Sequence, residues 1–595
     1  MRRDEEGDAS NEDGRGAPRV TDPREVQHGE ADLLAGQRDL TAGEVTGEFP
    51  AEAVVARSER KSLSTGKGAF LVGAGILLSR IVGVVRQRVF AYFLGTSDAM
   101  DAFNAAFRIP NFLQNVFGEG ALSASMIPVY AKLLAQDDEE EADRVAWSIF
   151  TLLALVVSAF VLVGVSATPL FINAIALGFK DEKRELTLQL VRIFFPGAGL
   201  LVLSAWCLGI LNSHRRFFLS YTAPVIWNLT LIAALFWAGW PSRGVAETNL
   251  AVWGRVATFA AWGSVVGSAL QFGVQLPTVL RLLRRVRLTL DLKNKHVRTV
   301  LSNFVPVFVS RGVVQISAFV DTLLASLLGQ GAVSALSYAQ SLYTLPVSLF
   351  GISVSAAELP EMSSAVGEQS EVAEKLRVRL SAGLRQIAFF IVPSAVAIVA
   401  LGDVMVAALY QSGKFGRADT VYVWAILAGS AVGLLPSTFG RLYASTFYAL
   451  HDTRTPLRYA ALHVALATVL GYLFALWLPP LFGLDLRWGA VGLTVSAGLA
   501  GWAELVLLRR RLNARIGRTG LSASFALKLW VAAGASAAVG WGLKLLLGAV
   551  HPIILAALVL TPFGLLYFAI TSLWGLPEAR VVVERFTRVL GRRGK

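Results

Sequence analysis

The stretch KGAFLVGAGILLSRIVGVVRQRVFAYFLG, residues 67–95, decides the fold class of this chain. As a helix, its apolar run is long enough to cross a hydrocarbon core of about 30 Å. Similar apolar stretches recur along nearly the whole sequence, and we count about fourteen of them. Hydrophobic residues make up 54% of the 595 residues and charged residues only 16%, which leaves too little polar surface to cover a water-soluble globule. The sequence therefore predicts an all-α polytopic membrane protein.

Hydropathy places the expected transmembrane helices at 68–94, 99–134, 145–175, 187–212, 218–240, 252–280, 299–328, 332–364, 382–411, 420–449, 457–480, 488–508, 522–549 and 552–576. A weak internal repeat aligns Ser79–Arg80 with Ser310–Arg311. The repeat divides the first twelve helices into two six-helix lobes around a central cavity, an architecture suited to alternating access. Chance similarity between two apolar helices is the alternative explanation of the repeat.

The chain then divides into six parts. We expect a disordered cytoplasmic arm (1–67), an N-lobe (68–280), a basic cytoplasmic linker (281–298), a C-lobe (299–508), two further helices (522–576) and a basic cytoplasmic tail (577–595). The arginine-rich connections fall on one side of the membrane if the helices alternate in direction. The positive-inside rule makes that side cytoplasmic, so both termini are expected in the cytoplasm and the protein in the bacterial inner membrane.

Charge and cysteine content exclude several other classes. The first 67 residues hold ten Lys and Arg against fifteen Asp and Glu and no long apolar core, so no cleaved signal peptide is expected. The net charge of +13 therefore comes from the membrane part. Its basic clusters sit between apolar segments, a pattern typical of contacts with anionic lipid headgroups rather than with nucleic acid. The single cysteine, Cys207, excludes a disulfide within the chain.

Ionisable side chains inside the expected membrane helices are the candidate functional residues. They are Arg80, Arg86, Asp101, Arg108 and Glu119 in the first two helices, and Arg311 and Asp321 in the seventh. Because a charge at this depth is costly, such groups usually face a bundle interior or a hydrated cavity. The arginines are predicted to bind phosphate groups, and the three acids to orient the arginines. The structural alternative is that arginines and acids only pair with one another and hold helices together.

Enzyme and metal chemistry find no support in the sequence. No P-loop, nucleophile motif or metal-ligand cluster is recognisable, so a transporter rather than an enzyme is expected, without a metal or an organic cofactor. His463 has no carboxylate or cysteine partner nearby in sequence, and we interpret it as a packed histidine.

Residues 79–133 resemble the amino-terminal signature of the lipid II flippase family, MurJ or MviN, within the multidrug/oligosaccharidyl-lipid/polysaccharide exporter superfamily. The matching features are SR-x-x-G-x-x-R from Ser79, DAF from Asp101, F-x-x-P-N-x-L from Phe107, and F-x-EGA from Phe117 followed by Pro128. The segment ALHDTRTP (449–456) is similar to the family's short cytoplasmic turn between its tenth and eleventh helices.

The resemblance implies a flippase that moves lipid II, the undecaprenyl-pyrophosphate-linked disaccharide pentapeptide, from the cytoplasmic to the periplasmic leaflet for peptidoglycan synthesis and cell wall biogenesis. It places Arg80 and Arg86 on the family's cavity arginines, and Asp101 and Glu119 on its acids. It also makes helices 522–576 the groove for the lipid tail. Cell-wall synthesis proteins are further candidate partners.

Two arginines common in the family are absent, because Asn115 and Ser341 stand at their places. Our hypothesis is that Arg108 and Arg311 compensate, so that Arg311→Ala is expected to impair complementation of a flippase-depleted strain.

Some relatives are thought to bind sodium through acids of the seventh and eleventh helices. Here the helix at 457–480 contains no carboxylate, so Asp321 alone does not establish such a site. The membrane potential or an ion gradient is the expected driving force.

Three alternatives to the lipid II flippase stay open at this point. The first is a flippase for another polyprenyl-linked oligosaccharide. The second is a drug/cation antiporter of the same superfamily, although such an antiporter is expected to place carboxylates rather than arginines in its cavity. The third is a scaffold for cell-wall enzymes, which would tolerate charge-neutral substitutions of the membrane arginines.

Overall fold

The computed structural model describes residues 75, 77–245, 249–283, 286–364, 368–548 and 550–580. The predicted arm 1–67 and the tail from residue 581 on lie outside the described residues, as do the side chains of Glu119 and Arg311. Within the described part, the chain is helical apart from short connections, and its one β-type pairing is an isolated bridge between Ser412 and Phe415. The predicted all-α fold class is confirmed.

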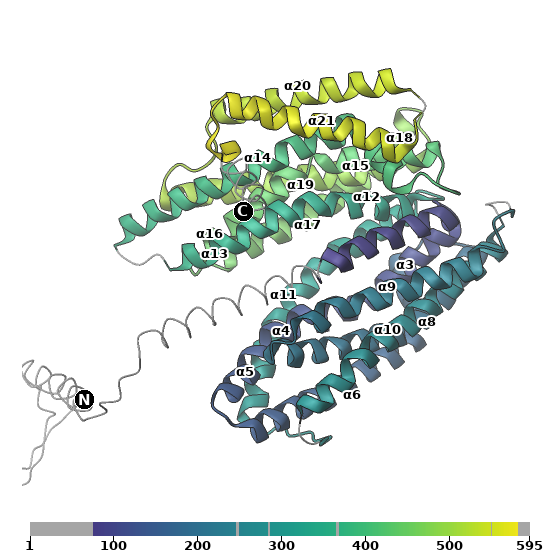
Figure 1. Cartoon of the computed structure of the whole chain (residues 1–595), viewed down its shortest axis with the longest axis vertical. Coiled ribbons are helices and arrows are strands. Elements are labelled where there is room, and N and C mark those ends of the chain that lie inside the picture. Colours follow the sequence, from purple (N-terminus) through teal and green to yellow (C-terminus); the bar gives the residue numbers. More distant parts are fainter. Residues whose placement is uncertain are drawn as a thin grey trace, which may run out of the picture. The chain divides into compact units, whose positions relative to one another are not determined.

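The first bundle, purple to teal in Figure 1, begins with a helix over residues 77–94. It continues with α3 (Asp98–Phe117), α4 (Glu119–Ser125), α5 (Ile127–Ala135), α6 (Glu139–Ser166), α7 (Thr168–Ile175), α8 (Asp181–Ser213), α9 (Phe217–Gly239) and α10 (Leu250–Leu282). The single helix expected at 99–134 is therefore three helices. The first break lies at Gly118, where a Cβ would stand 2.1 Å from the carbonyl oxygen of Gln114, so only glycine fits the turn.

The second bundle is green to yellow in Figure 1. It contains α12 (Ala332–Pro346), the π-helical turn η1 (Val347–Ile352), α13 (Ser353–Ser363), α14 (Gln369–Tyr410), α15 (Arg417–Ala431), α16 (Leu434–Ala449), α17 (Arg454–Tyr472), η2 (Leu473–Trp477), α18 (Leu478–Leu481), η3 (Leu486–Trp488) and α19 (Gly489–Ile516). The last two helices, α20 (Ala523–Leu547) and α21 (Pro552–Leu573), pack on each other and on α14. Between the bundles, α11 (Lys295–Ser326) contacts α3 and α4 on one side and α17 and α19 on the other.

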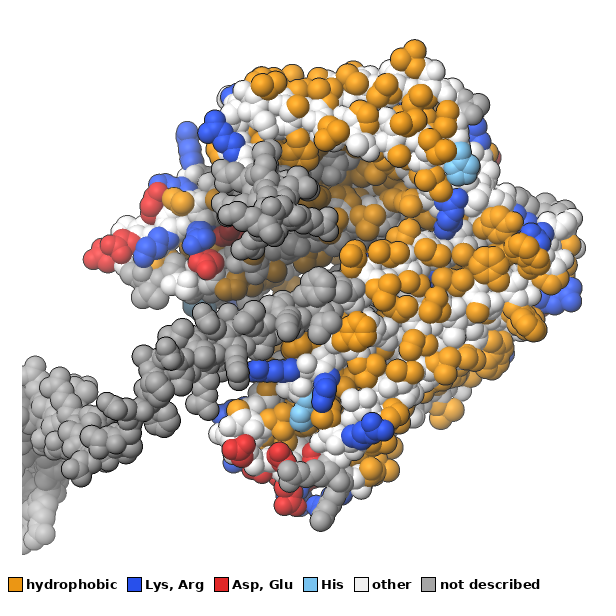
Figure 2. Space-filling view, viewed as in Figure 1, with side chains coloured by type: hydrophobic (Ala, Val, Ile, Leu, Met, Phe, Trp, Pro, Cys, Tyr) orange, Lys and Arg blue, Asp and Glu red, His pale blue; other side chains and the backbone are white. Residues whose placement is uncertain are grey.

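Eleven helical segments of the described residues are long and apolar enough to cross a membrane, and each coincides with one of the fourteen expected helices. None of the eleven segments falls in the described part of the expected helices 68–94, 99–134 and 299–328, the three that carry the candidate arginines and acids. Hydrophobic side chains cover the visible face of α20 and α21, and charged side chains gather towards the ends of the bundles (Figure 2). This distribution is that of a multi-pass membrane protein.

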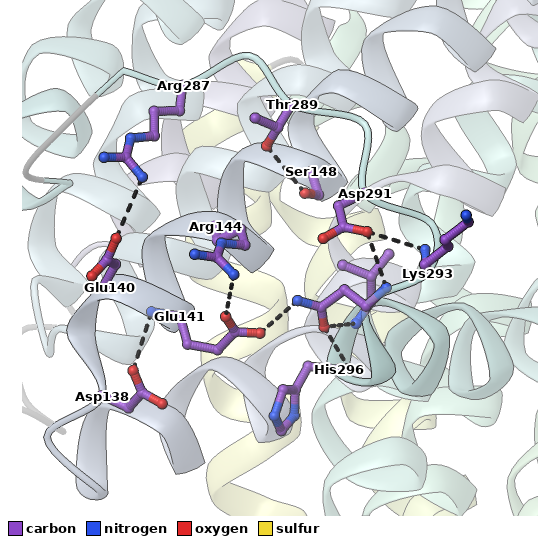
Figure 3. Close-up of polar contacts among 12 residues, drawn as sticks. Asp138, Glu140, Glu141, Arg144, Ser148, Arg287, Thr289, Asp291, Lys293 and His296 are labelled. Carbon is purple, nitrogen blue, oxygen red and sulfur yellow. Dashed lines mark hydrogen bonds and ion pairs between the residues drawn. The ribbon is translucent and has the colours of Figure 1, made fainter.

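The connection between α10 and α11 is fastened to α6 (Figure 3). Arg287 approaches Glu140 at 3.4 Å, Thr289 lies 3.4 Å from Ser148, and the Asn294 amide donates to Glu141 at 2.5 Å. Within the predicted linker 281–298, α10 ends at Leu282 and α11 begins at Lys295. Polar contacts with α6 therefore hold the segment that joins the two bundles.

The turn between α16 and α17 is built around Asp452. Its carboxylate accepts hydrogen bonds from the backbone N–H of Thr455 at 2.9 Å and from the Thr455 hydroxyl at 2.8 Å, and it forms an ion pair of 2.7 Å with Arg515. These hydrogen bonds, followed by the arginine charge, lower the pKa of Asp452 below its ordinary value. Asp452, which belongs to the ALHDTRTP segment, therefore stabilises this turn through its hydrogen bonds to Thr455.

Candidate functional site

A cavity of about 600 Å³, which we call cavity 1, brings three of the predicted arginines together. Arg80 and Arg86 reach it from the helix at 77–94, and Arg108 reaches it from α3. The rest of its wall comes from α8, α9, α10, α12 and α14, so both bundles contribute. The described lining contains amides such as Gln271 but no Asp or Glu, so the charge presented to the cavity is positive.

Arg86 is held by packing rather than by an acid. Its guanidinium lies 4.9 Å from the centroid of the Trp227 ring on α9. Its Nε is buried without a hydrogen-bond partner among the described residues. An unsatisfied charged donor of this kind gains free energy when an anion or ordered water accepts from it. Arg80 is exposed and lines the same cavity, where a solvated cation can meet an arriving anion.

Arg108 joins the first bundle to α11. Its Nη1 donates to the carbonyl oxygen of Ala318 at 2.8 Å and to the hydroxyl of Thr322. The same arginine also lines a second cavity of about 640 Å³, which we call cavity 2. Ser337 and Gln340 of α12 are likewise common to both linings. Arg108 therefore stands in the wall between the two cavities.

Cavity 2 collects polar groups from both bundles, including Asp321 of α11 and His463 of α17. Asn115, which stands where the resemblance expects an arginine, lines this cavity and donates to Gln315 at 3.1 Å. Ser341, the other replacement, lines cavity 1. The two substituted positions thus face different cavities.

Among the described residues, the partners of Asp101 are a lysine and a helix start rather than an arginine, which differs from our expectation for it. The side chain is fully buried and forms an ion pair of 2.8 Å with Lys183 of α8. It also accepts the backbone N–H groups of Gly331 at 2.7 Å and Ser334 at 2.8 Å, at the start of α12. Because a helix start carries partial positive charge and unpaired N–H groups, a carboxylate is stable there. Asp101 therefore fastens the first bundle to the second.

Further contacts close the bundles together around Asp101. Tyr338 donates to the carbonyl oxygen of Gly95 at 3.1 Å, the Lys414 N–H donates to Tyr92 at 3.0 Å, and Thr96 donates to Asp419 at 2.5 Å. We call this end of the molecule, which holds Asp101 and residues 411–419, the Asp101 end. In this conformation the two bundles are joined there.

A second difference concerns His463. Its Nδ1 lies 2.7 Å from Oε2 of Glu504 on α19, 41 residues away in sequence, so the histidine does have a carboxylate partner. The sequence pattern missed this pair because the partner lies on the next long helix rather than on the same one. Lys183 and Trp227 were missed because they lie on helices far along the chain from Asp101 and Arg86. Among the described residues, no group of three His, Cys, Asp or Glu side chains is arranged to hold a metal ion.

Known proteins match this chain over most of its length. The family model described as lipid II flippase MurJ covers residues 90–568. The probable lipid II flippase MurJ of Rhizobium tropici is 31% identical over 450 residues, which cover 75% of this chain and 80% of that protein. The lipid II flippase MurJ of Burkholderia cenocepacia is 31% identical over 445 residues, covering 74% of this chain and 82% of that protein.

Solved structures agree in fold. One described as lipid II flippase MurJ in an inward closed conformation matches with a TM-score of 0.67 at 24% identity, covering 85% of this chain and 98% of that one. An inward-facing multidrug resistance MATE family transporter of the MOP superfamily matches with a TM-score of 0.58 at 18% identity, covering 73% of this chain and 95% of that one. Since the family model spans most of the sequence and the curated relatives match over about four fifths of their own length, this chain belongs to the lipid II flippase MurJ family.

Proposed function

We propose that this protein is a lipid II flippase, which moves undecaprenyl-pyrophosphate-linked disaccharide pentapeptide from the cytoplasmic to the periplasmic leaflet. The observation that supports it most is the meeting of Arg80, Arg86 and Arg108 in cavity 1, whose described lining lacks a carboxylate. Guanidinium groups bind phosphate oxygens through paired, charge-assisted hydrogen bonds. A pyrophosphate therefore suits cavity 1, whereas a cationic drug would be repelled. The protein acts as a transporter and not as an enzyme.

The Asp101 end is periplasmic in this proposal, and both termini are cytoplasmic. The basic clusters at Arg215–Arg216, 281–298 and 509–518 then lie on the cytoplasmic side, in agreement with the positive-inside rule. There they meet anionic lipid headgroups, and cell-wall synthesis proteins are further candidate partners. With the Asp101 end closed, cavity 1 receives cargo from the cytoplasmic leaflet. Release requires the contacts of Asp101 to break, which is alternating access between two packed bundles.

The helices α20 and α21 are the proposed groove for the polyprenyl tail. They pack on α14 outside the two bundles, and their outward side chains include Leu546, which is 84% exposed, and Leu573, which is 85% exposed. A long apolar tail can stay in contact with this surface while the headgroup passes through cavity 1. The proposal explains why two further helices follow those that form the bundles.

The membrane potential, negative inside, drives the outward step. Moving one negative charge outward through 100 mV releases roughly 2.3 kcal/mol, and the pyrophosphate carries more than one such charge. The free energy is sufficient to bias the exchange between two conformations that differ by a few kcal/mol.

Depletion of the protein from its host cell tests the function. We expect lipid II to accumulate and to remain on the cytoplasmic leaflet. Complementation with the Arg80→Ala, Arg86→Ala, Arg108→Ala triple variant is expected to fail, and complementation with Arg243→Ala to succeed. Arg243 is the matched control, because it stacks on Trp240 at the surface and lines neither cavity. Depletion without accumulation of lipid II would contradict the proposal.

A further inference from the structure

Cavity 2 carries two titratable groups that phosphate binding does not use, Asp321 from α11 and His463 from α17. Arg108 from α3, which also lines cavity 1, lies in the same lining. Amide side chains, among them Asn104 and Asn111, surround these groups. A space of about 640 Å³ with this many polar groups is large enough and polar enough to hold several water molecules. Protons can therefore reach His463 through water.

Two features of α19 position His463. Its Nδ1 lies 2.7 Å from Oε2 of Glu504, and its ring packs over Gly501, where a Cβ would stand 3.7 Å from the ring carbon Cε1. The His463 side chain is 28% exposed and that of Glu504 is 24% exposed, so both side chains are partly accessible to solvent. The imidazole is thus oriented by its carboxylate partner, and its residue lines cavity 2.

A histidine that is hydrogen-bonded to a carboxylate can hold one extra proton, and His463 and Glu504 form such a pair. With the proton bound, the pair is neutral overall, as imidazolium and carboxylate. Without the proton, the pair carries one negative charge. The proton adds to the second ring nitrogen, and no bond between heavy atoms changes.

The proton is coupled to the contact between the bundles through Asp321. Asp321, Arg108 and His463 line the same cavity, so the charge of Asp321 acts on both basic groups. Arg108 in turn holds α3 against α11 through Ala318 and Thr322. Tyr448 of α16 lies within electrostatic range of both Glu504 and Arg441. A charged His463 therefore competes with Arg108 for Asp321 and weakens the attraction between α3 and α11.

We infer that His463 and Glu504 form a proton-binding site whose occupation favours separation of the bundles at the Asp101 end. The proton is then a coupling ion of the transport cycle, a role that rests on the proposed flippase function. The pH-dependent conformational change itself does not depend on the identity of the cargo.

Spin labels test the inference without any lipid cargo. The labels are placed at residues 244 and 484, which are exposed on the Asp101 end of the first and second bundle, in a Cys207→Ala background. Distances are measured by double electron–electron resonance in nanodiscs from about pH 5 to about pH 8. The population with the longer distance is expected to grow as the pH falls, with one midpoint.

Three variants give different expected outcomes. His463→Gln abolishes the pH response, and Glu504→Gln moves its midpoint to lower pH by about one unit or more, because the imidazolium loses its counter-charge. His551→Asn leaves the response unchanged, since this histidine lies at the start of α21 and asparagine also caps a helix. If His463→Gln does not fold, the midpoint shift of Glu504→Gln decides the test.

A wild-type distance distribution that is independent of pH would overturn the inference, as would an unchanged response in His463→Gln or an unchanged midpoint in Glu504→Gln. Because these measurements contain no cargo, their failure leaves the flippase proposal standing. Conversely, a failure of lipid II to accumulate on depletion would leave the proton site standing.

Discussion

The carboxylate of Asp101 accepts a hydrogen bond of 2.7 Å from the backbone N–H of Gly331, 230 residues away, at the start of α12. Gly331 adopts a positive φ of 81°, and a Cβ there would stand 2.8 Å from the carbonyl oxygen of Thr96. Only glycine therefore allows α12 to begin so close to the first bundle. The closed Asp101 end depends on one acid and one glycine from different bundles.

Asp101→Asn is expected to destabilise the closed Asp101 end by about 2–4 kcal/mol, because the charge-assisted contacts to Lys183 and to α12 are lost. The spin-label pair at 244 and 484 is expected to report a larger population with the longer distance. Asp98→Asn is the control, since Asp98 contacts Lys183 at 2.7 Å and is not among the residues capping α12. Equal effects of the two substitutions would argue against the helix contact.

Arg86→Ala is expected to weaken binding of undecaprenyl pyrophosphate by about 10–100-fold, equivalent to about 1.4–3 kcal/mol. Arg86→Lys recovers only part of this loss, because an ammonium group lacks the planar fork that binds phosphate and stacks on Trp227. Binding is measured with purified protein in detergent. Arg243→Ala is the matched control and keeps wild-type affinity, and full affinity in Arg86→Ala would exclude this residue from the binding site.

A double-mutant cycle tests the link between Arg108 and Asp321. Arg108→Gln alone removes the positive charge that faces Asp321 and is expected to lower the thermal stability. Adding Asp321→Asn restores part of it, with a coupling free energy of about 0.5–3 kcal/mol. The measurement is thermal unfolding of the four proteins in one detergent. Strictly additive effects would show that the two side chains do not interact.

Asp452 gives the ALHDTRTP turn a pH dependence. Because its pKa is lowered in the folded protein, its contribution to stability is present above the unfolded pKa of about 3.9 and is lost as the pH falls through the lower folded value. Asp452→Asn is therefore expected to lower the unfolding temperature at pH 7 by about 1–2 °C. The difference from wild type should vanish in strong acid, and a difference independent of pH would contradict the assignment.

Asn294 caps α11 and also fastens the linker to α6. Its side-chain oxygen accepts the backbone N–H of His296 at 2.8 Å, while its amide donates to Glu141. Asn294→Ala is expected to cost about 1 kcal/mol and to speed hydrogen exchange in residues 286–294. Asn249→Ala is the control, because Asn249 caps α10 through Val252 and lies outside the linker. An unchanged exchange rate in the linker would show that Glu141 does not hold it.

Hydropathy alone located eleven long apolar helices of this protein, because a bilayer-spanning helix must present an apolar run of sufficient length. None of these eleven falls in the described part of the three expected helices that carry the candidate arginines and acids. Arg80, Arg86 and Arg108 were predicted to be functional residues because they lie within expected membrane helices. An arginine in that position is costly unless it faces a hydrated surface. All three line one cavity.

Hydropathy could not assign partners, because a helix's rotation about its axis is set by the helices that pack on it. Asp101 was expected to orient an arginine, but tertiary packing brought it to Lys183 and the start of α12. His463 was interpreted as a packed histidine, yet α19 supplies Glu504 at 2.7 Å. The sequence by itself thus determined which eleven segments are long and apolar enough to cross a membrane, and which charged residues lie in the expected helices. Only the tertiary structure decided which charges meet, because contacts between helices far apart in the chain depend on how the whole bundle packs.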